Sequence, residues 1–483
     1  MSIKFGTDGW RGIIADDFTF ASLEIVARGI AEYLKSAPRK TLPLYRQNNP
    51  QASYQAEYRP FEKGVVVGFD RRFQSDNFAR KLSEVLARHQ IPVYLSTQPV
   101  PTPAISWALV KQACCAGIVI TASHNPWEWN GVKFKAEYGS SGLPEIMDLI
   151  QQEVDLSAGK PAEDDEISPA LIEPTDVMRD YLNKLCQLVD LERIKAAHLK
   201  IVADPMYGVD AGLLPGLLPG VIEIRNEHNP LFGGVNPEPI EKNVGTLREA
   251  VLAHQADLGI AFDGDGDRLG SFDGRGAYMG SHELIPLLLT HLVKNRKWDG
   301  GLAVSFSTSQ MGQRLAEALS LPVFITPIGF KYLCELMLKE NILLAGEESG
   351  GIGFKNYLPE RDGLLSALLL LEYMAYEQKS LNQLMDDLRE KIGSFYSSRI
   401  DLKLSNKEQV YQKLKNYPPA TISGFRVKEI DRLDGSKFLL EGGSWLLFRL
   451  SGTEPLIRIY AEGENPAEVQ NLLEAGKEFC LRS

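Results

Sequence analysis

The sequence predicts an α/β protein built of several domains, and three observations lead to this expectation. Its 483 residues are too many for one hydrophobic core, since a domain usually holds roughly 150 residues. Short β-branched or apolar runs alternate with helical patterns over the first 392 residues, which favours parallel α/β layers. From residue 393 onwards, alternating strands and a final helix at 465–482 indicate an α+β domain of a different kind.

The predicted strands of the α/β part share one design, an apolar run that closes in a polar or glycine-rich loop. They are GVVVGFD (64–70), AGIVITASHNP (116–126), LKIVADPMYG (199–208), ADLGIAFDGDGDR (256–268), GLAVSFSTS (301–309) and ILLAGEESGG (342–351). Open α/β sheets bind their ligands outside the carboxyl ends of their strands. These loops are therefore expected to gather along one edge of each sheet.

The domain boundaries are predicted from breaks in this pattern. The polar, acidic segment 157–176 is typical of a linker, and further breaks fall near Gly276–Gly280 and at Gly393. The segment 42–63, rich in Gln, Asn, Tyr and Pro, is expected to be a surface insertion without an assigned function. The predicted domains are 1–156, 157–278, 279–392 and 393–483.

Composition excludes several classes of function. Hydrophobic residues make up 44% and charged residues 24%, as in ordinary globular proteins, and the net charge of −11 argues against nucleic-acid binding. The five cysteines lack zinc-type spacing and are odd in number, which fits a reducing compartment. The stretch MSIKFGTDGWRG has no apolar core of signal-peptide length and the most apolar run is short and carries Glu372, so neither a signal peptide nor a membrane span is expected. We expect a cytoplasmic protein without a membrane or nucleic-acid partner, either a monomer or a dimer.

The strongest local motif is FDGDGDR, residues 262–268, directly after an apolar run. Asp263, Asp265 and Asp267 alternate with glycine, so a tight backbone can aim three carboxylates at one point, where they would repel each other without a cation. Hard oxygen ligands suit Mg²⁺. An EF-hand loop is excluded because Arg268 and Gly274 stand where it needs glycine and glutamate. An acidic surface turn remains the alternative.

A second motif is GIVITASHNPWEWNGVKFK, residues 117–135. The apolar run Ile118–Ile120 predicts a short interior strand, and Asn125-Pro126 ends it. Ser123 thus lies at the carboxyl end of a strand, where the geometry permits a working hydroxyl without demanding one. A serine before Asn-Pro is most often only a turn or helix-cap residue, so this alternative stays open.

Two further loops carry groups that bind sugars and phosphates. GEESGG, residues 346–351, offers Glu347, Glu348 and Ser349 for hydrogen bonds to sugar hydroxyls, although an acidic helix start would look similar. FRLSGTEPLIRIYAEG, residues 448–463, sets a small turn between two arginines, which favours a phosphate site over a plain exposed strand. Neither a P-loop, a GxGxxG motif nor a GxSxG elbow is present, so nucleotide cofactors and serine hydrolysis are not supported.

Taken together and in this order, the motifs resemble those of the α-D-phosphohexomutase family, the phosphoglucomutases and phosphomannomutases. The resemblance rests on FGTDGWRG, TASHNP, DGDGDR, TPIGFKYL, GEESGG and RLSGTEPLIRIY, which span nearly the whole chain. It implies a heart-shaped enzyme with three similar α/β domains and a fourth, α+β domain that closes over the cleft.

The resemblance also implies a role for each matching residue. Ser123 would carry the phosphoryl group and would share Mg²⁺ with Asp263, Asp265 and Asp267. Arg11 and Lys133 would contact the transferred phosphoryl group, with Lys133 a candidate for proton transfer, and His124 and Arg268 match further active-site positions. Glu347 and Ser349 would hold sugar hydroxyls. The set implied for the nonreacting phosphate is Arg449, Ser451, Gly452, Thr453 and Arg458, and the set implied for sugar orientation is Thr326, Gly329 and Lys331.

The implied reaction interconverts glucose 1-phosphate and glucose 6-phosphate through a phosphoserine enzyme and a hexose 1,6-bisphosphate, with glucose 1,6-bisphosphate as activator. Mannose phosphates stay open as substrates. Gly351 departs from phosphomannomutase-type relatives, which often have a histidine there that is proposed as a proton acceptor, so the second base is unassigned and a phosphoglucomutase is favoured. Alternatives are a glucose 1,6-bisphosphate synthase of the same family, a phosphoglucosamine mutase, which GEESGG disfavours, and a noncatalytic sugar-phosphate sensor, which the intact Ser123 and aspartates disfavour.

Overall fold

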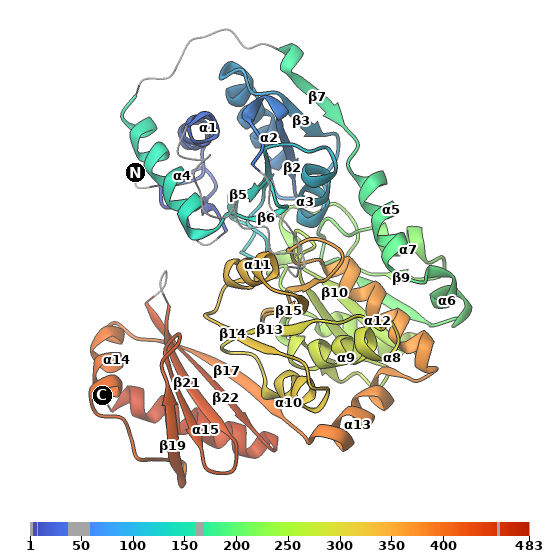
Figure 1. Ribbon diagram of the computed structural model, residues 1–483, viewed down its shortest axis with the longest axis vertical. Coiled ribbons are helices and arrows are strands. Elements are labelled where there is room, and N and C mark those ends of the chain that lie inside the picture. Colours follow the sequence, from blue (N-terminus) through green and yellow to red (C-terminus); the bar gives the residue numbers. More distant parts are fainter. Residues whose placement is uncertain (1–2, 7, 37–57, 161–168, 452–454, 483) are drawn as a thin grey trace.

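Four β-sheets follow one another along the chain, each with its own helices (Figure 1). The computed structural model describes residues 3–6, 8–36, 58–160, 169–451 and 455–482. The α/β prediction and the change to an α+β pattern near the C-terminus are both confirmed. Of the predicted insertion, residues 42–57 lie outside the described part, and the remainder ends in a short 3₁₀ turn at Phe61–Lys63.

The first sheet is mixed and carries the Ser123 loop. Its order is β1-β5-β4-β2-β3-β7, with β6 beside β5. The bounds are β1 Trp10–Ile13, β2 Val65–Phe69, β3 Val93–Ser96, β4 Ala116–Ile120, β5 Trp129–Ala136, β6 Ser140–Ser141 and β7 Ile172–Thr175. Strand β4 pairs parallel to β2 and antiparallel to β5, so the predicted strand before Ser123 is an interior one.

Two cores flank this sheet. Alternate residues of an interior strand face opposite sides, and Val66 and Val119 accordingly belong to one core while Val65 and Ile118 belong to the other. The helices are α1 Phe20–Lys35, α2 Ser75–Arg88, α3 Thr102–Lys111 and α4 Pro144–Ala158. Strand β7 lies within the segment predicted as a linker and extends the sheet parallel to β3. The domain boundaries therefore stay predictions.

The second and third sheets repeat the strand-then-polar-loop design. The second consists of β8 Ile201–Asp204, β9 Ile222–Glu223, β10 Leu258–Phe262, β11 Leu269–Asp273 and β12 Tyr278–Met279, and the third of β13 Gly301–Ser305, β14 Val323–Thr326, β15 Ile342–Gly346 and β16 Ile352–Phe354. Their helices are α5 Met178–Leu188, α6 Leu191–Ala196, α7 Leu213–Leu217, α8 Gly245–His254, α9 Ser281–Lys294, α10 Gln310–Ala318, α11 Phe330–Lys339, α12 Gly363–Glu377 and α13 Leu381–Ile392.

Strands β10 and β15 are fully buried and pair parallel to β8 and β13, and each is followed by an antiparallel strand. The DGDGDR and GEESGG loops thus emerge at the carboxyl ends of interior strands, as predicted.

The fourth sheet is antiparallel throughout, in the order β17-β22-β21-β20-β19-β18. It consists of β17 Tyr396–Lys403, β18 Thr421–Ile422, β19 Phe425–Asp431, β20 Ser436–Leu440, β21 Trp445–Leu450 and β22 Leu456–Gly463, with α14 Lys407–Asn416 and α15 Pro466–Leu481. Helix α15 covers one face through Leu472 and Leu473, which pack in the core of this domain.

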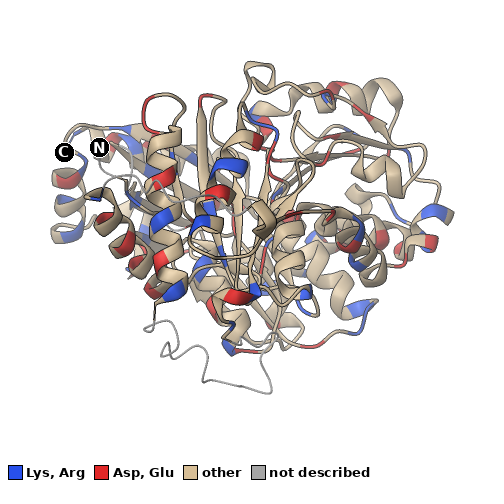
Figure 2. Cartoon of the chain, turned by 90° about the horizontal axis from the view of Figure 1, so that it is seen from above, with Lys and Arg blue, Asp and Glu red and all other residues tan. Residues whose placement is uncertain are grey.

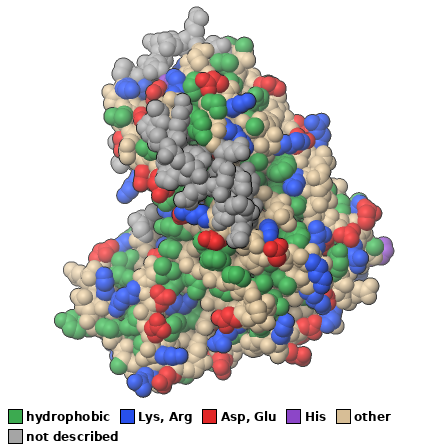
Figure 3. All heavy atoms as spheres, viewed as in Figure 1, with side chains coloured by type: hydrophobic (Ala, Val, Ile, Leu, Met, Phe, Trp, Pro, Cys, Tyr) green, Lys and Arg blue, Asp and Glu red, His purple; other side chains and the backbone are tan. Residues whose placement is uncertain are grey.

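The sheets lie in an arc, with the first and fourth at its two ends (Figure 1). Figure 3 shows the molecule indented between these ends, and Figure 2 shows that acidic and basic residues are interspersed along the chain. Among the helices that the structure describes, none combines the length and the apolar character needed to cross a membrane.

Candidate active site

Ser123 lies where the first sheet meets the DGDGDR loop of the second, residues 263–268, called the metal loop below because the sequence predicts a metal there. Its side chain is buried, and its Oγ donates to Asp263 Oδ2 at 2.9 Å. The serine has a φ of 54°, in the left-handed region that L-residues other than Asn and Asp rarely adopt. Its backbone N–H donates to Thr121 Oγ1 at 2.8 Å. The hydroxyl is therefore held against the metal loop by an unusual backbone turn.

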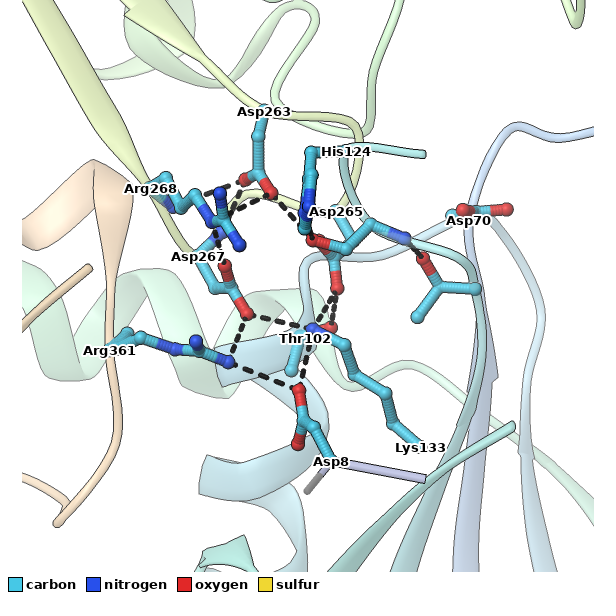
Figure 4. Close-up of polar contacts among 12 residues, drawn as sticks. Asp8, Asp70, Thr102, His124, Lys133, Asp263, Asp265, Asp267, Arg268 and Arg361 are labelled. Carbon is cyan, nitrogen blue, oxygen red and sulfur yellow. Dashed lines mark hydrogen bonds and ion pairs between the residues drawn. The ribbon is translucent and has the colours of Figure 1, made fainter. Parts of the chain in front are cut away.

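The three aspartates of DGDGDR converge as predicted (Figure 4). Each is fully buried, and each offers an oxygen within 4.8 Å of the others. Asp263 Oδ1 accepts from the backbone N–H groups of Asp267 and Arg268, which fixes the tight loop. Burial, with the charges of Asp267 and Asp265 next, raises the pKa of Asp263 well above its usual range.

The aspartate cluster fits a divalent cation. Asp265 Oδ1 and Asp267 Oδ1 are buried, yet neither accepts a hydrogen bond from any residue in the described part of the chain. Buried carboxylate oxygens without donors are costly unless a cation faces them. Oxygen donors of this kind suit Mg²⁺, so these residues could hold it.

Lys133 joins the site from β5, where it pairs in register with Val119 of β4. Its Nζ donates to Asp265 Oδ2 at 2.7 Å and to Asp267 Oδ2 at 2.8 Å, and lies 3.3 Å from Asp8 Oδ2. Burial acts to lower the pKa of Lys133, but the charges of these carboxylates outweigh it, so the pKa lies above its usual value. Lys133 offsets part of the negative charge of the cluster.

The remaining predicted catalytic residues surround the serine. Arg11 Nη1 donates to Asn125 Oδ1 at 2.5 Å, and Arg268 lies within 4.0 Å of both Asp263 and Asp267. His124 Nδ1 is 3.3 Å from Ser123 Oγ. Burial, followed by the charges of Arg268 and other basic groups, lowers the pKa of His124 well below its usual value. The structure thus brings together all five residues predicted as catalytic.

Arg361, which no sequence motif had indicated, links this cluster to the third domain. Its Nη2 donates to Asp267 Oδ2 at 2.8 Å and to Asp8 Oδ2 at 3.2 Å, and its Nη1 lies 3.5 Å from Glu347 Oε2. A Cβ placed on Gly351 would lie 2.2 Å from Arg361 Cδ. The glycine that departs from the family pattern therefore makes room for the arginine side chain.

Arg361 also contacts the GEESGG loop, residues 346–351, which the sequence predicts to bind the sugar. Glu347 is buried, and burial raises its pKa to about 7 although Arg361 acts to lower it. Ser349 is half-buried in the same loop. Glu348 accepts from Ser307 Oγ at 2.8 Å and lies 3.8 Å from Arg399 Nη1 of β17, so the fourth domain reaches this loop.

The TPIGFKYL loop and Arg449 share one partner, Asp434. Thr326 ends β14, Gly329 has a φ of 135° before α11, and Lys331 lies half-buried in the first turn of that helix. The backbone N–H of Ile328 donates to Asp434 Oδ2 at 2.8 Å, and Arg449 Nε donates to Asp434 Oδ1 at 3.0 Å. The Asp434 carboxylate therefore links the TPIGFKYL loop to Arg449, next to the turn that the sequence predicts to bind phosphate.

That turn connects β21 and β22, in which Arg449 and Arg458 pair directly opposite each other. Ser451 is buried, and its carbonyl oxygen accepts from Lys407 Nζ at 2.6 Å. Gly452 and Thr453, also predicted to bind phosphate, lie outside the described residues. The two arginines thus lie on the two strands that flank this turn, as the sequence predicts.

Comparison with known proteins matches the chain along most of its length. Models of the phosphoglucomutase/phosphomannomutase family match in order: alpha/beta/alpha domain I at residues 51–158, domain II at 179–276, domain III at 280–392 and the C-terminal domain at 401–477.

Relatives that align with most of this chain carry mutase names. A phosphoglucomutase/phosphomannomutase of Thermococcus kodakarensis is 29% identical over 99% of this chain and 98% of its own. A phosphoglucosamine mutase of Clostridioides difficile is 29% identical over 84% of this chain and 88% of its own. A solved structure assigned as a phosphomannomutase, from Thermus thermophilus, has 34% identity and a TM-score of 0.83 over 99% of both chains. The chain therefore belongs to the phosphoglucomutase/phosphomannomutase family, whose members are phosphohexomutases, enzymes that transfer a phosphoryl group.

Proposed function

We propose that this enzyme interconverts glucose 1-phosphate and glucose 6-phosphate, with mannose phosphates as further substrates, by way of a phosphoserine at Ser123. The single observation that carries this proposal is the hydroxyl of Ser123, buried and hydrogen-bonded to one of three convergent aspartates. A serine hydroxyl beside a cation site is suited to carrying a phosphoryl group, because phosphoserine brings about −1.5 to −2 charges that must be neutralised. The odd number of cysteines supports a cytoplasmic location.

The residues around Ser123 divide the work of transfer. Asp263, Asp265 and Asp267 would hold Mg²⁺ together with an oxygen of the phosphoserine. When bound, the ion would supply positive charge that stabilises the transferring phosphoryl group. The side chains of Arg11, Lys133, His124 and Arg268 line the same point and would position that group and share its charge.

The chemical step exchanges one phosphorus–oxygen bond for another. The oxygen of a sugar hydroxyl attacks the phosphorus of phosphoserine, the bond from phosphorus to Ser123 Oγ breaks, and the proton that the sugar hydroxyl loses ends on Ser123 Oγ. Glucose 1-phosphate thereby becomes glucose 1,6-bisphosphate. The bisphosphate then turns round, and its other phosphate returns a phosphoryl group to Ser123. Glucose 1,6-bisphosphate added from outside would rephosphorylate an empty serine and so act as activator.

The remaining predicted residues would hold the sugar and its nonreacting phosphate. Glu347 and Ser349 would accept and donate hydrogen bonds to sugar hydroxyls, and Thr326, Gly329 and Lys331 would orient the ring. Paired guanidinium groups suit a phosphate that must be held in both orientations. That site would consist of Arg449, Ser451, Gly452, Thr453 and Arg458.

A second substrate class has one observation in its favour. Relatives of comparable identity include a phosphoglucosamine mutase, so glucosamine phosphates belong in the same assay. A glucose 1,6-bisphosphate synthase would use the same serine but release the intermediate early.

The test is coupled turnover of glucose 1-phosphate, mannose 1-phosphate and glucosamine 1-phosphate, with and without glucose 1,6-bisphosphate. We expect the highest kcat/KM for glucose 1-phosphate and a stimulation by the bisphosphate. Intact-mass analysis should find one phosphate on the native protein and none on Ser123→Ala, which should be inactive but folded. An active Ser123→Ala variant would refute the phosphoserine, and net release of bisphosphate as the main product would favour the synthase.

A further inference from the structure

Arg72, in the turn between β2 and α2, contacts the backbone of the Ser123 loop at four points. Only 3% of this residue is exposed. Its Nη2 donates to the carbonyl oxygens of Ser123 at 2.6 Å and of Asn125 at 2.7 Å, and its Nη1 donates to those of Pro126 at 2.7 Å and of Trp129 at 3.0 Å. One guanidinium therefore gathers carbonyls from the whole width of the loop.

The guanidinium itself is fixed from two other directions. Its Nε forms an ion pair with Asp70 Oδ2 at 3.1 Å, and its Cζ lies over the ring of Phe232, from the second domain, at 4.9 Å from the ring centroid. Asp70 is held in turn, because its Oδ1 accepts from the Arg72 backbone N–H and from Ser75 Oγ. Arginine suits this position, since it has a rigid fork of donors and a flat face that stacks on aromatic rings.

The loop that Arg72 contacts has a strained backbone at Ser123. Ser123 adopts a φ of 54°, and both of its backbone polar groups are tied: the N–H to Thr121 Oγ1 and the carbonyl to Arg72. The metal loop also approaches closely here, because a Cβ on Gly264 would lie 2.6 Å from the Ser123 carbonyl oxygen. Strained backbone persists only where its surroundings determine it. A small shift of this carbonyl would turn the Oγ away from Asp263.

We propose that Arg72 is a positioning residue for phosphoryl transfer: it clamps the Ser123 loop in the strained conformation that points the hydroxyl at the metal loop. This inference rests on the proposed role of Ser123 as phosphoryl carrier. In this role Arg72 acts through the loop, by gathering the carbonyls of Ser123, Asn125, Pro126 and Trp129. Misplacing a reacting group by about 1 Å can cost on the order of a hundredfold in rate.

The test compares Arg72→Lys and Arg72→Ala with the matched control Arg71→Ala. Arg71 is the neighbouring arginine, and its contacts are to the Gly208 and Asn226 carbonyl oxygens rather than to the Ser123 loop. In Arg72→Lys we expect kcat to fall roughly tenfold to a hundredfold, while the KM for hexose phosphate changes little. The lysine keeps the charge but lacks the fork. Arg71→Ala should retain the native kcat.

Chemical rescue separates positioning from stability. Arg72 lines an open cleft of about 550 Å³, together with Asp70 and Phe73, through which guanidinium ion can reach the vacated place. We expect millimolar guanidinium to restore part of the kcat of Arg72→Ala, and ammonium at the same concentration to restore none. A melting curve by circular dichroism shows that each variant is folded.

Each result decides the question. A folded Arg72→Lys with native kcat, a loss confined to KM, or an absence of rescue would overturn the clamp. If even the lysine variant fails to fold, Arg72 serves the fold rather than the loop, and the clamp is likewise overturned. A native protein that takes no phosphate on Ser123 would refute the proposed function and the clamp with it, whereas native turnover with unaffected Arg72 variants would refute the clamp alone.

Discussion

The contact between Gly351 and Arg361 gives a prediction whose size follows from the structure. In Gly351→Ala, the new Cβ would lie 2.2 Å from Arg361 Cδ and 2.9 Å from Arg361 Cγ. Carbon atoms in contact normally stay about 3.5–4.0 Å apart, so the arginine must move by more than about 1 Å. Its hydrogen bond to Asp267, now 2.8 Å long, would then open.

Two costs follow from this movement. Overpacking of a buried site typically costs about 1–3 kcal/mol of unfolding free energy. Loss of a hydrogen bond between charged groups costs about 1.5–3 kcal/mol, part of which Lys133 offsets by its own contact with Asp267. We therefore expect Gly351→Ala to lower the unfolding free energy by at least about 2 kcal/mol and to reduce turnover roughly tenfold or more.

The assay is urea unfolding of four proteins: native, Gly351→Ala, Arg361→Ala and the double variant. With the arginine gone, alanine at 351 meets no clash, so the two changes should be strongly non-additive, with a coupling of about 1–2 kcal/mol. Gly216→Ala serves as the control, because a Cβ there has nothing within 4 Å. If Gly351→Ala costs the same in both backgrounds, the clash lies elsewhere and the reasoning fails.

Three further predictions concern the metal, the phosphate turn and pH. Asp265→Asn removes one ligand charge from the cluster and should raise the Mg²⁺ concentration needed for half-maximal turnover; full activity in excess chelator would contradict a metal site. Arg449→Ala should lower kcat/KM about ten- to hundredfold and increase the glucose 1,6-bisphosphate needed to keep the enzyme active, as measured by turnover against activator concentration; native values on both would remove this turn from the phosphate site. Burial raises the pKa of Asp362, the N-cap of α12, to about 7 from an ordinary 3.8. The folded state therefore binds the Asp362 proton more tightly than the unfolded state does. The resulting contribution to the unfolding free energy is full below about pH 4 and is lost as the pH rises to 7. Asp362→Asn keeps an N-cap, and its unfolding free energy, measured with urea, should fall less between pH 4 and 7 than that of the native protein. If the unfolding free energy of both proteins falls equally over this range, other groups cause the fall.

The parts of the site that a local pattern marks could be predicted from the sequence. The run before Ser123 and the run before Asp263 are apolar and end abruptly in polar turns, and both form interior strands that deliver these residues to one point. The alternation of strands and helices, and the change to an α+β pattern near the C-terminus, follow from the same periodicity.

The residues that local patterns do not mark could not be predicted as part of the site. Arg361 lies 94 residues from Asp267 and 353 from Asp8, and nothing in its own neighbourhood announces these partners. Arg399 reaches Glu348 from a half-exposed strand of ordinary composition. Long-range ion pairs depend on how whole domains pack, which the period of a single segment does not encode. Strand β7 was likewise not predictable from its own residues, because it forms a strand only by pairing with β3.

The carboxylate of Asp434 has a geometric consequence for how the third and fourth sheets can move. One of its oxygens accepts from the backbone of Ile328, in the loop after β14, and the other accepts from Arg449 of β21. A single rigid group thus spans the gap between the two, and their separation cannot exceed what it bridges. While both bonds persist, the loop after β14 and strand β21 stay at a fixed distance. The fourth sheet can therefore swing away from the third only if one of these two hydrogen bonds breaks.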